Sequence, residues 1–435
     1  MTTTKKVGRL VALLLALAML AAACGDDDDG DGDGDGTEAT TTTTTEAPAT
    51  TTEGGAAEGL DLKIGYVLPQ TGGLAPIIEA LVKPIEMAVS EIDAVGATSV
   101  TLVPGDSGTD PNVATVTVDD LLNDEVNAIV GPAASGVSLS VIDRITGSET
   151  PMCSPSNTGA AFTTYDDGGY YFRTAPSDVL QGPALADVIT ADGATSVAIV
   201  YRNDEYGAGF AGFLADGLEA NGVTVAAEVA YDPAATAFDA EAAQAAAAGV
   251  DAVAIITFAE GATLVQAMIE QGIGPDDMQI WVADGFKDTV QAVDVDPNDP
   301  SVLEGVKGTA PSAAPPTGEA TFGDRLEAFA PGTPTIFSSY SYDCLMSFVL
   351  AAESAGSSDP TAIQAAMNDV TRGGEKCSSY AECHALIASG ADIDYDGASG
   401  PLDFTDIGEP SAATYDVFEY DAEGVANTLE QVSIS

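Results

Sequence analysis

From residue 62 onward the chain alternates short apolar runs with amphipathic stretches, and this alternation restricts its fold more than any other feature. Four apolar runs are predicted strands, at residues 62–69, 100–104, 127–132 and 151–156. The segments between them carry apolar side chains at helical spacing, which predicts helices at 76–95, 113–123 and 135–145. This strand–helix order is typical of a parallel sheet with crossover helices.

The same pattern begins again near Ala194. Predicted strands lie at 196–201, 223–230, 251–258 and 278–283. Predicted helices lie at 207–220, 238–248 and 263–271. Two such runs, each of about a hundred residues, predict two doubly wound α/β lobes rather than one large sheet.

Two Pro-containing segments, 173–178 and 308–316, are predicted crossings between the lobes. Helices at 321–329 and 342–354 are expected to rejoin the first lobe, and a last strand at 414–420 to return to the second. We therefore predict that lobe 1 comprises 60–176 and 311–404 and that lobe 2 comprises 177–310 and 405–435. Three crossings would form a hinge about which the lobes close on a ligand.

The N-terminus has the pattern of a secretory signal. Lys5, Lys6 and Arg9 precede an apolar run at 11–20, which is too short to span a bilayer. The following Leu-Ala-Ala-Ala-Cys sequence, ending at Cys24, resembles the lipobox of bacterial lipoproteins, although Ala21 replaces the usual Leu. We expect a signal peptide at 1–23 and a lipid anchor on Cys24. A soluble product cut after Ala23 is the alternative.

Residues 24–59 are predicted to be a disordered linker, because beyond Cys24 they offer acids, Gly, Thr, Ala and Pro but no large apolar side chain. The Asp-Gly repeat in this segment suggests a calcium loop but lacks a bidentate acid at the required position. The whole chain has a formal net charge of −55. This charge excludes nucleic acid as a plausible partner, because phosphates would be repelled.

The remaining cysteines are compatible with disulfides in an exported protein. Cys377 and Cys383 are close enough in sequence to close one short loop, and we favour that pairing. Cys153 and Cys344 either pair or remain buried thiols. His384, the chain's one histidine, makes a Cys-Cys-His metal site conceivable, but a fourth ligand at zinc-like spacing is missing. We predict no metal.

Catalytic motifs are also missing. With one histidine, any Ser-His-Asp or Cys-His arrangement would depend on His384, and the segment 131–136 lacks the Lys of a phosphate-binding loop. Residues 392–403 begin like a calcium loop, but the twelfth residue is Asp403 and no helix follows, so a structural turn is favoured. The sequence therefore predicts a protein that is not an enzyme and has no cofactor.

Polar residues follow several predicted strands, where open α/β sheets bind ligands. Ser135 opens a helix and could bind an anion there, or merely cap the helix. The turn at 156–158 offers hydroxyl and amide groups, or is an ordinary turn. Tyr206 could cover a ligand or only pack. Asp284 could neutralise a ligand ammonium or cap a helix.

Several strings, among them IGYVLPQTG, AIVGPAASGVS, SPSNTGAAFTT and YFRTAPSDVLQGPALAD, identify a resemblance. From 62 to 420 the chain resembles type I periplasmic binding proteins of the branched-chain amino-acid (Leu/Ile/Val-binding) family. The resemblance implies that Ser135 binds a ligand carboxylate, that Tyr206 covers the ligand, and that Asp284 pairs with its ammonium. It implies further ligand-binding positions at Ala133, Ala134, Ser156, Asn157, Thr158, Phe258 and Phe337.

The function implied by this resemblance is passive capture of a solute. We expect the substrate-binding component of an ABC importer for a branched-chain or related aliphatic amino acid. It would be monomeric, extracytoplasmic and lipid-anchored, and its closed form would dock on membrane permease subunits. Asp284 is one methylene shorter than the Glu often found there, so the amino acid stays open. Alternatives are a sensory module for a receptor, or an importer for an amide, urea-like compound or aromatic acid.

Overall fold

The computed structural model describes residues 59–312 and 322–434, which belong to one compact unit, Ala57–Ser435. The predicted signal peptide, Cys24 and almost the whole linker lie outside the described residues. So do residues 313–316 of the second predicted crossing, together with 317–321. Within the described ranges no helix is both long and apolar enough to cross a membrane.

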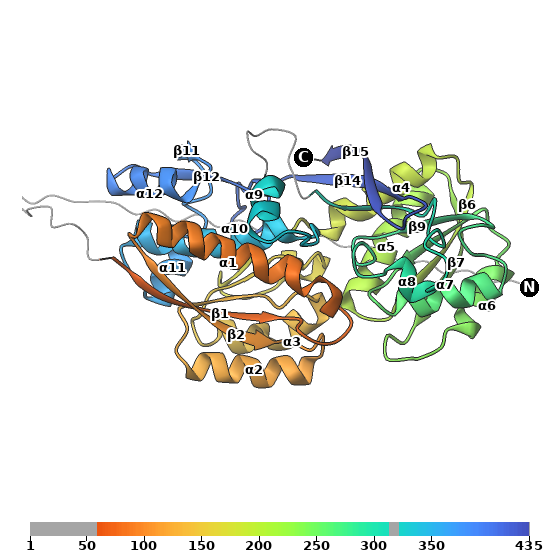
Figure 1. The fold of residues 1–435 in the computed structure, drawn as a ribbon, viewed down its shortest axis with the longest axis horizontal. Coiled ribbons are helices and arrows are strands. Elements are labelled where there is room, and N and C mark those ends of the chain that lie inside the picture. The colour runs from red at the N-terminus through yellow and green to blue at the C-terminus, as the bar shows by residue number, and fades with distance from the viewer. Residues whose placement is uncertain (1–58, 313–321, 435) are drawn as a thin grey trace, which may run out of the picture. The chain divides into compact units, whose positions relative to one another are not determined.

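The first sheet has five parallel strands in the order β2-β1-β3-β4-β5. Their bounds are Asp61–Leu68 (β1), Ser99–Asp106 (β2), Ala128–Val130 (β3), Met152–Ser154 (β4) and Tyr171–Arg173 (β5). Helices α1 (Ile78–Val95) and α10 (Ser338–Ala355) pack together on one face, and α2 (Pro111–Asn123) and α3 (Ser135–Thr146) on the other (Figure 1). Short 3-10 turns η1 (Ala75–Ile77) and η2 (Ala160–Thr164) lie in its loops.

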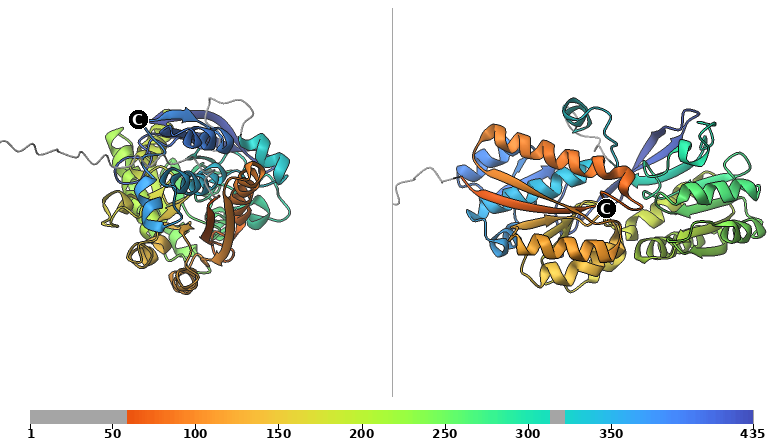
Figure 2. Two further views of the ribbon diagram at one scale, coloured as in Figure 1. Left: turned by 90° about the vertical axis from the view of Figure 1, so that its left-hand side faces the viewer. Right: turned by 60° about the horizontal axis from the view of Figure 1, so that its bottom comes forward.

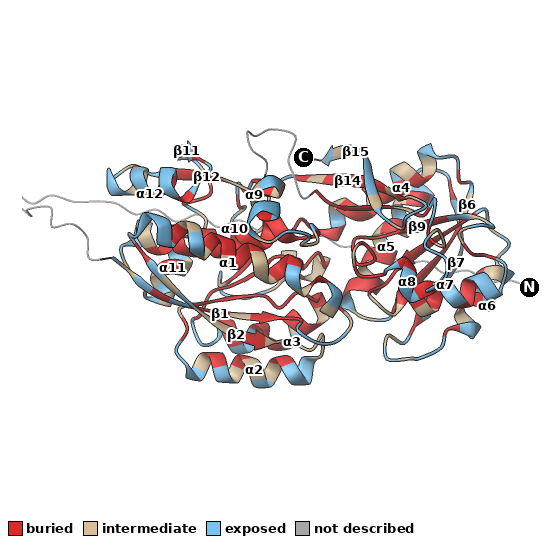
Figure 3. Cartoon of the chain, in the orientation of Figure 1, coloured by how far each residue is buried: buried red, intermediate tan, exposed pale blue. Residues whose placement is uncertain are grey.

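The core of this sheet follows from its sequence pattern. The central strands β3 and β4 are buried at every position, as expected for strands covered on both faces. On α1 the buried residues Leu81, Ile85 and Ile92 recur at helical spacing, and the helix has a buried and an exposed side (Figure 3).

The second sheet has seven strands in the order β15-β14-β10-β9-β8-β6-β7. Their bounds are Ser196–Arg202 (β6), Thr224–Tyr231 (β7), Ala252–Ile256 (β8), Gln279–Val282 (β9), Lys307–Pro311 (β10), Ala413–Tyr420 (β14) and Ala426–Ile434 (β15). Strands β6 to β10 are parallel, but β14 and β15 run antiparallel at one edge. The predicted α/β fold with parallel sheets is thus confirmed, and the second sheet adds two antiparallel strands at one edge.

Helices cover both faces of the second sheet, with α4 beside α5 and α6 beside α7 (Figure 2). Their bounds are Asp178–Ala191 (α4), Glu205–Ala220 (α5), Asp239–Ala247 (α6), Gly261–Glu270 (α7) and Ala292–Val295 (α8). The sequence did not predict α4. Its Gly182-Pro183 pair and its buried Asp178 and Gln181 disguise the helical pattern.

Two strands that the sequence did not predict overlap the predicted crossings: β5 ends at Arg173, where the first crossing begins, and β10 covers the start of the second. Each has three to five residues, so its apolar pattern is too brief to detect. A small three-stranded sheet was also missed, with strands β11 (Glu375–Cys377), β12 (Ile393–Gly397) and β13 (Gly400–Pro401). The other helices are α9 (Phe322–Phe329), α11 (Pro360–Ala366) and α12 (Tyr380–Ala388). The residue limits of the two lobes stay a prediction.

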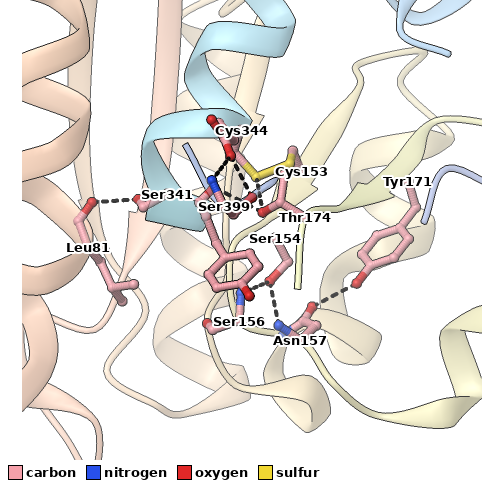
Figure 4. The surroundings of a disulfide bond; sticks show 12 residues. Leu81, Cys153, Ser154, Ser156, Asn157, Tyr171, Thr174, Ser341, Cys344 and Ser399 are labelled. Atoms are coloured by element: carbon pink, nitrogen blue, oxygen red, sulfur yellow. Dashed lines mark hydrogen bonds between the residues drawn. A yellow bond between two sulfur atoms is a disulfide. The ribbon is translucent and has the colours of Figure 1, made fainter. Parts of the chain in front are cut away.

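Two disulfides are formed among the residues that the structure describes. Cys377–Cys383 is the favoured pairing, and Cys153–Cys344, left open by the sequence, joins β4 to α10 across the first lobe (Figure 4). The calcium-like segment is a hairpin turn between β12 and β13. Asp343 accepts bonds from the Tyr395 hydroxyl at 2.7 Å and from the backbone N–H of Ser399 at 2.8 Å, so this turn is held by a protein carboxylate.

Candidate functional site

A small cavity lies where the carboxyl ends of the two sheets face each other, as expected for ligand sites of open α/β sheets. Its empty volume, including its mouth, is about 330 Å³. Residues of both lobes line it: Leu74, Ile77, Ala133, Ser135, Ser156, Tyr206, Phe258, Asp284, Gly285, Thr289 and Phe337. Seven of the ten predicted binding residues are thus brought together.

The first-lobe wall is organised around Ser135, the first residue of α3. The backbone N–H of Gly159 donates to Ser135 Oγ at 3.3 Å, so the serine hydroxyl keeps its own hydrogen for another acceptor. The neighbouring Ser156 hydroxyl donates to the carbonyl of Ala133 at 3.0 Å. The first N–H groups of a helix have no intrahelical partner, so this wall is suited to an anionic group.

The second-lobe wall is organised around Asp284, which follows β9 and is buried. Its Oδ1 accepts from the Tyr206 hydroxyl at 3.0 Å and from Gln181 Nε2 at 3.1 Å. Burial raises the pKa of Asp284 to about 6, although these hydrogen bonds oppose the shift. The N–H of Gly285 in turn donates to the Tyr206 hydroxyl at 3.2 Å, which fixes the tyrosine over the cavity.

Apart from Thr289, the remaining lining is apolar. The Phe258 ring is stacked against Tyr206 with centroids 5.3 Å apart, and the Arg202 guanidinium carbon lies 3.6 Å from its centroid. Leu74 and Phe337 complete this wall. Phe337 adopts φ 55°, a conformation uncommon for a bulky residue, at the N-terminus of α10.

The two lobes also touch beside the cavity. The N–H of Ala259, just after β8, donates to the carbonyl of Gly73 in the loop after β1 at 3.2 Å. A Cβ on Gly73 would lie 3.8 Å from Phe258 Cβ. These two contacts place Phe258 and Ala259 of lobe 2 directly against the Gly73 loop of lobe 1.

Three predicted residues do not line the cavity. Ala134 precedes α3 as its N-cap. Asn157 is fully buried, and its amide donates to the Ala133 carbonyl at 2.8 Å and accepts from the Tyr171 hydroxyl at 3.1 Å (Figure 4). Thr158 is buried behind the cavity, and its hydroxyl makes no hydrogen bond of normal geometry among the described residues. For all ten residues, ligand binding itself stays a prediction.

One acidic residue of this region was missed by the sequence. Asp178 is the first residue of α4, is fully buried, and its carboxylate oxygens make no hydrogen bond of normal geometry within the described ranges, although the Thr158 hydroxyl and the Arg173 charge lower its pKa in part. Burial, together with the nearby negative charge of Asp284, raises the pKa of Asp178 well above its ordinary value. The Pro-containing pattern at 173–178 predicts a crossing and does not indicate that Asp178 is buried at the start of a helix. A Ser-Asp pair opening a helix was the available signal.

No cluster of three or more His, Cys, Asp or Glu side chains able to hold a metal ion occurs within 59–312 and 322–434. The sulfurs of Cys377 and Cys383 are bonded to each other, so the conceivable Cys-Cys-His site is not formed. The site therefore consists of two lobes, a helix N-terminus, a buried acidic corner and an apolar wall.

Fold and site together define a two-lobed solute-binding protein. The family model described as "Periplasmic binding protein" matches residues 61–374, and the chain belongs to that family. The predicted type I periplasmic binding fold is thereby confirmed. Members of this family are extracytoplasmic binding proteins rather than enzymes.

Among curated relatives, the chain is 26% identical over 367 residues to the Halobacterium salinarum chemotactic signal transduction system substrate-binding protein BasB. This match covers 81% of the chain and 85% of BasB. The chain is also 31% identical to an uncharacterized Methanocaldococcus jannaschii protein, over 42% of the chain and 46% of that protein.

Two solved structures share the fold. The substrate-binding protein LivJ from Streptococcus pneumoniae, in complex with isoleucine, has a TM-score of 0.71 at 20% identity, covering 86% of this chain and 100% of LivJ. A solute-binding protein from R. palustris, in complex with benzoate, has a TM-score of 0.70 at 17% identity and covers 86% and 98%. Similarity at this level establishes the fold and leaves the ligand to be argued from the site.

Proposed function

We propose that this protein is the substrate-binding component of an ABC importer and captures an aliphatic α-amino acid between its lobes. The observation that carries the proposal is the pair of buried acids, Asp178 and Asp284. Buried carboxylates are costly unless a positive group pairs with them. Asp284 lines the cavity, and none of the described residues that line the cavity is positively charged, so a ligand ammonium is the natural partner of Asp284. Asp178 does not line the cavity but lies near Asp284, and the positive charge of Arg173 lowers its pKa in part.

The opposite wall supports the other half of an amino acid. The Ser135 hydroxyl and the first turn of α3 would donate to a ligand carboxylate. A positive group beside Asp284 and a negative group beside Ser135 together describe a zwitterion. The apolar wall of Leu74, Phe258 and Phe337 would then contact an aliphatic side chain.

The same features disfavour the alternative ligands. An aromatic acid, like the benzoate bound by the R. palustris protein, supplies no positive charge for the acidic corner. An amide or urea-like compound is neutral and would leave the buried Asp284 carboxylate without a counter-charge. An amino acid alone among these classes satisfies both walls.

The mechanism is capture by closure. In the open form the ligand would bind first to the Ser135 wall of lobe 1. Lobe 2 would then close, bringing Tyr206 and Asp284 onto the ammonium and forming the Ala259–Gly73 contact. Closure makes the bound form distinct, so that permease subunits can recognise it. Other subunits of the transporter would hydrolyse ATP.

Calorimetry with a ligand panel tests this proposal. Leucine, isoleucine and valine should bind, and benzoate and 4-hydroxybenzoate should not. Tight binding of either benzoate, with no heat from any amino acid, would refute the amino-acid assignment.

A sensory role is the second candidate, because the relative with the wider coverage is a chemotactic substrate-binding protein. Both roles use the same ligand capture and differ in the partner. Deleting the gene and measuring uptake of labelled leucine separates them. Transport predicts a loss of uptake, and unchanged uptake with a lost chemotactic response would favour sensing.

We also propose that the mature protein is tethered through lipidated Cys24, with 24–59 as a flexible linker. A linker of this composition would let the binding lobes reach a permease while staying at the membrane. Intact-mass spectrometry of the membrane fraction should show a diacylglyceryl adduct on an N-terminal cysteine. A soluble, unmodified product beginning at Cys24 would contradict the anchor.

A further inference from the structure

We propose that Arg173 is a positioning residue for ligand capture, holding Gly159 so that its N–H fixes the Ser135 hydroxyl that faces the cavity. The inference rests on the proposed function and adds to it a residue that neither lines the cavity nor touches the ligand. It follows from a chain of hydrogen bonds that runs from a lobe crossing to the binding serine.

Arg173 ends β5 and is completely buried. Its Nη1 donates to the carbonyl of Gly159 at 2.9 Å and to the carbonyl of Asn157 at 3.2 Å. Its Nη2 donates to the Thr163 hydroxyl at 3.0 Å. The guanidinium therefore holds both ends of the 157–163 segment, which follows directly after the Ser156 wall of the cavity.

The charge of Arg173 is balanced by Glu409, which lies in the chain segment between β13 and β14, where the polypeptide returns to the second sheet. Glu409 Oε2 accepts from Arg173 Nε at 3.0 Å and from the Thr163 hydroxyl at 3.1 Å. The backbone also joins here, because the N–H of Arg173 donates to the carbonyl of Gly408 at 2.9 Å. The Arg173–Glu409 ion pair thus connects the crossing after β5 with the 157–163 segment beside the cavity.

The last residue in this series of hydrogen bonds is Gly159. Its carbonyl accepts from Arg173, and its N–H donates to Ser135 Oγ at 3.3 Å. Because that N–H occupies a lone pair of the serine oxygen, the serine hydrogen is directed toward another acceptor, which we assign to the ligand carboxylate. Loosening Gly159 would leave Ser135 in place but free its hydroxyl to rotate.

A purely structural role is the competing interpretation, because Arg173 also lies 5.8 Å from the centroid of Phe162, whose ring stacks on Tyr171. A structural role predicts a general loss of stability and of affinity for every ligand. A positioning role predicts a loss confined to ligands with a carboxylate. Leucine and leucinamide differ in this group and share the ammonium and the side chain.

The test uses the full chain with Glu409→Gln, Arg173→Lys and, as matched control, Glu91→Gln, which removes the remote ion pair with Arg325. Calorimetry measures leucine and leucinamide binding. We expect Glu409→Gln to weaken leucine binding about three- to tenfold and Arg173→Lys more, with little change for leucinamide. Glu91→Gln should change neither affinity. Glu409 is partly exposed, so its amide variant is expected to fold even if Arg173→Lys does not.

Hydrogen exchange of the ligand-free protein supplies an independent readout. The Gly159 amide should exchange faster in Glu409→Gln than in wild type or in Glu91→Gln. Equal losses for leucine and leucinamide, or unchanged leucine binding and exchange, would overturn the inference. If wild type binds no amino acid, the proposed function fails, and the exchange measurement still decides whether the ion pair holds Gly159.

Discussion

Replacing Asp178 by Asn should weaken ligand binding while stabilising the ligand-free protein. In this structure, which contains no ligand, the carboxyl group is fully buried without a hydrogen bond of normal geometry in the described part of the chain, so burying its charge opposes folding. Removing that charge should raise the free energy of unfolding by about 1 kcal/mol. With ligand bound, the same carboxylate would contact an ammonium, and residues selected for such contacts trade stability for binding.

The loss of binding can be estimated from this contact. A charge-assisted hydrogen bond contributes about 1.5–3 kcal/mol, so Asp178→Asn should raise the Kd for leucine by about ten- to a hundredfold. Calorimetry gives the Kd, and differential scanning calorimetry without ligand gives the Tm.

Asp343→Asn is the matched control for a buried acid. Asp343 is equally buried but accepts bonds from Tyr395 and from the N–H groups of Ala398 and Ser399. The Asp343→Asn variant should therefore have a lower Tm and an unchanged Kd for leucine. An Asp178→Asn variant that binds leucine like wild type, or that is destabilised as Asp343→Asn is, would refute the reasoning.

Three further predictions follow from charge and covalent structure. Because the pKa of Asp284 is raised to about 6, its ionisation opposes folding of the free protein. The free energy of unfolding should therefore fall as the pH rises from about 4 to about 6, and the affinity for leucine should rise over the same range. Calorimetry in two buffers should detect the release of protons on leucine binding. Replacing both cysteines of the Cys153–Cys344 pair, which spans 191 residues, by Ala should lower the free energy of unfolding, measured by chemical denaturation, by about 5 kcal/mol. The same replacement of the Cys377–Cys383 pair, which spans 6, should lower it by about 2 kcal/mol, and equal losses would contradict this prediction. With 68 Asp and Glu against 13 Lys and Arg, the Tm should rise with added salt, and a salt-independent Tm would show that surface repulsion is unimportant.

The fold was largely predictable because buried parallel strands and their crossover helices leave strong periodic patterns. Among the elements that escaped detection, α4 shows most clearly why the rest of the fold was not predictable. Its Gly182 packs directly against α5, where a Cβ would lie 2.6 Å from Phe213 Cβ, and its Asp178 and Gln181 face the buried corner. Close packing and polar function removed the amphipathic pattern that identifies a helix.

The sequence could predict those residues of the candidate site whose position depends only on their following a parallel strand. Ser135 and Asp284 follow β3 and β9, and parallel topology brings such positions to one edge. Sequence could not decide which side chain of a turn faces the cavity. In the turn after β4, Ser156 lines it, while the Asn157 amide bonds to Ala133 and Tyr171. Asp178 was hidden because its neighbours in space come from distant parts of the chain.

The comparison of leucine with 4-methylpentanoic acid tests the central claim most directly. The two ligands share the side chain and the carboxylate and differ in the amino group that Asp178 and Asp284 are proposed to bind. By titration calorimetry at pH 7.5, leucine should bind at least about a hundredfold more tightly, as expected for a buried ammonium with two acidic partners. Equal affinity, or tighter binding of the amine-free acid, would contradict the account of the acidic corner and the assignment of an amino acid as ligand.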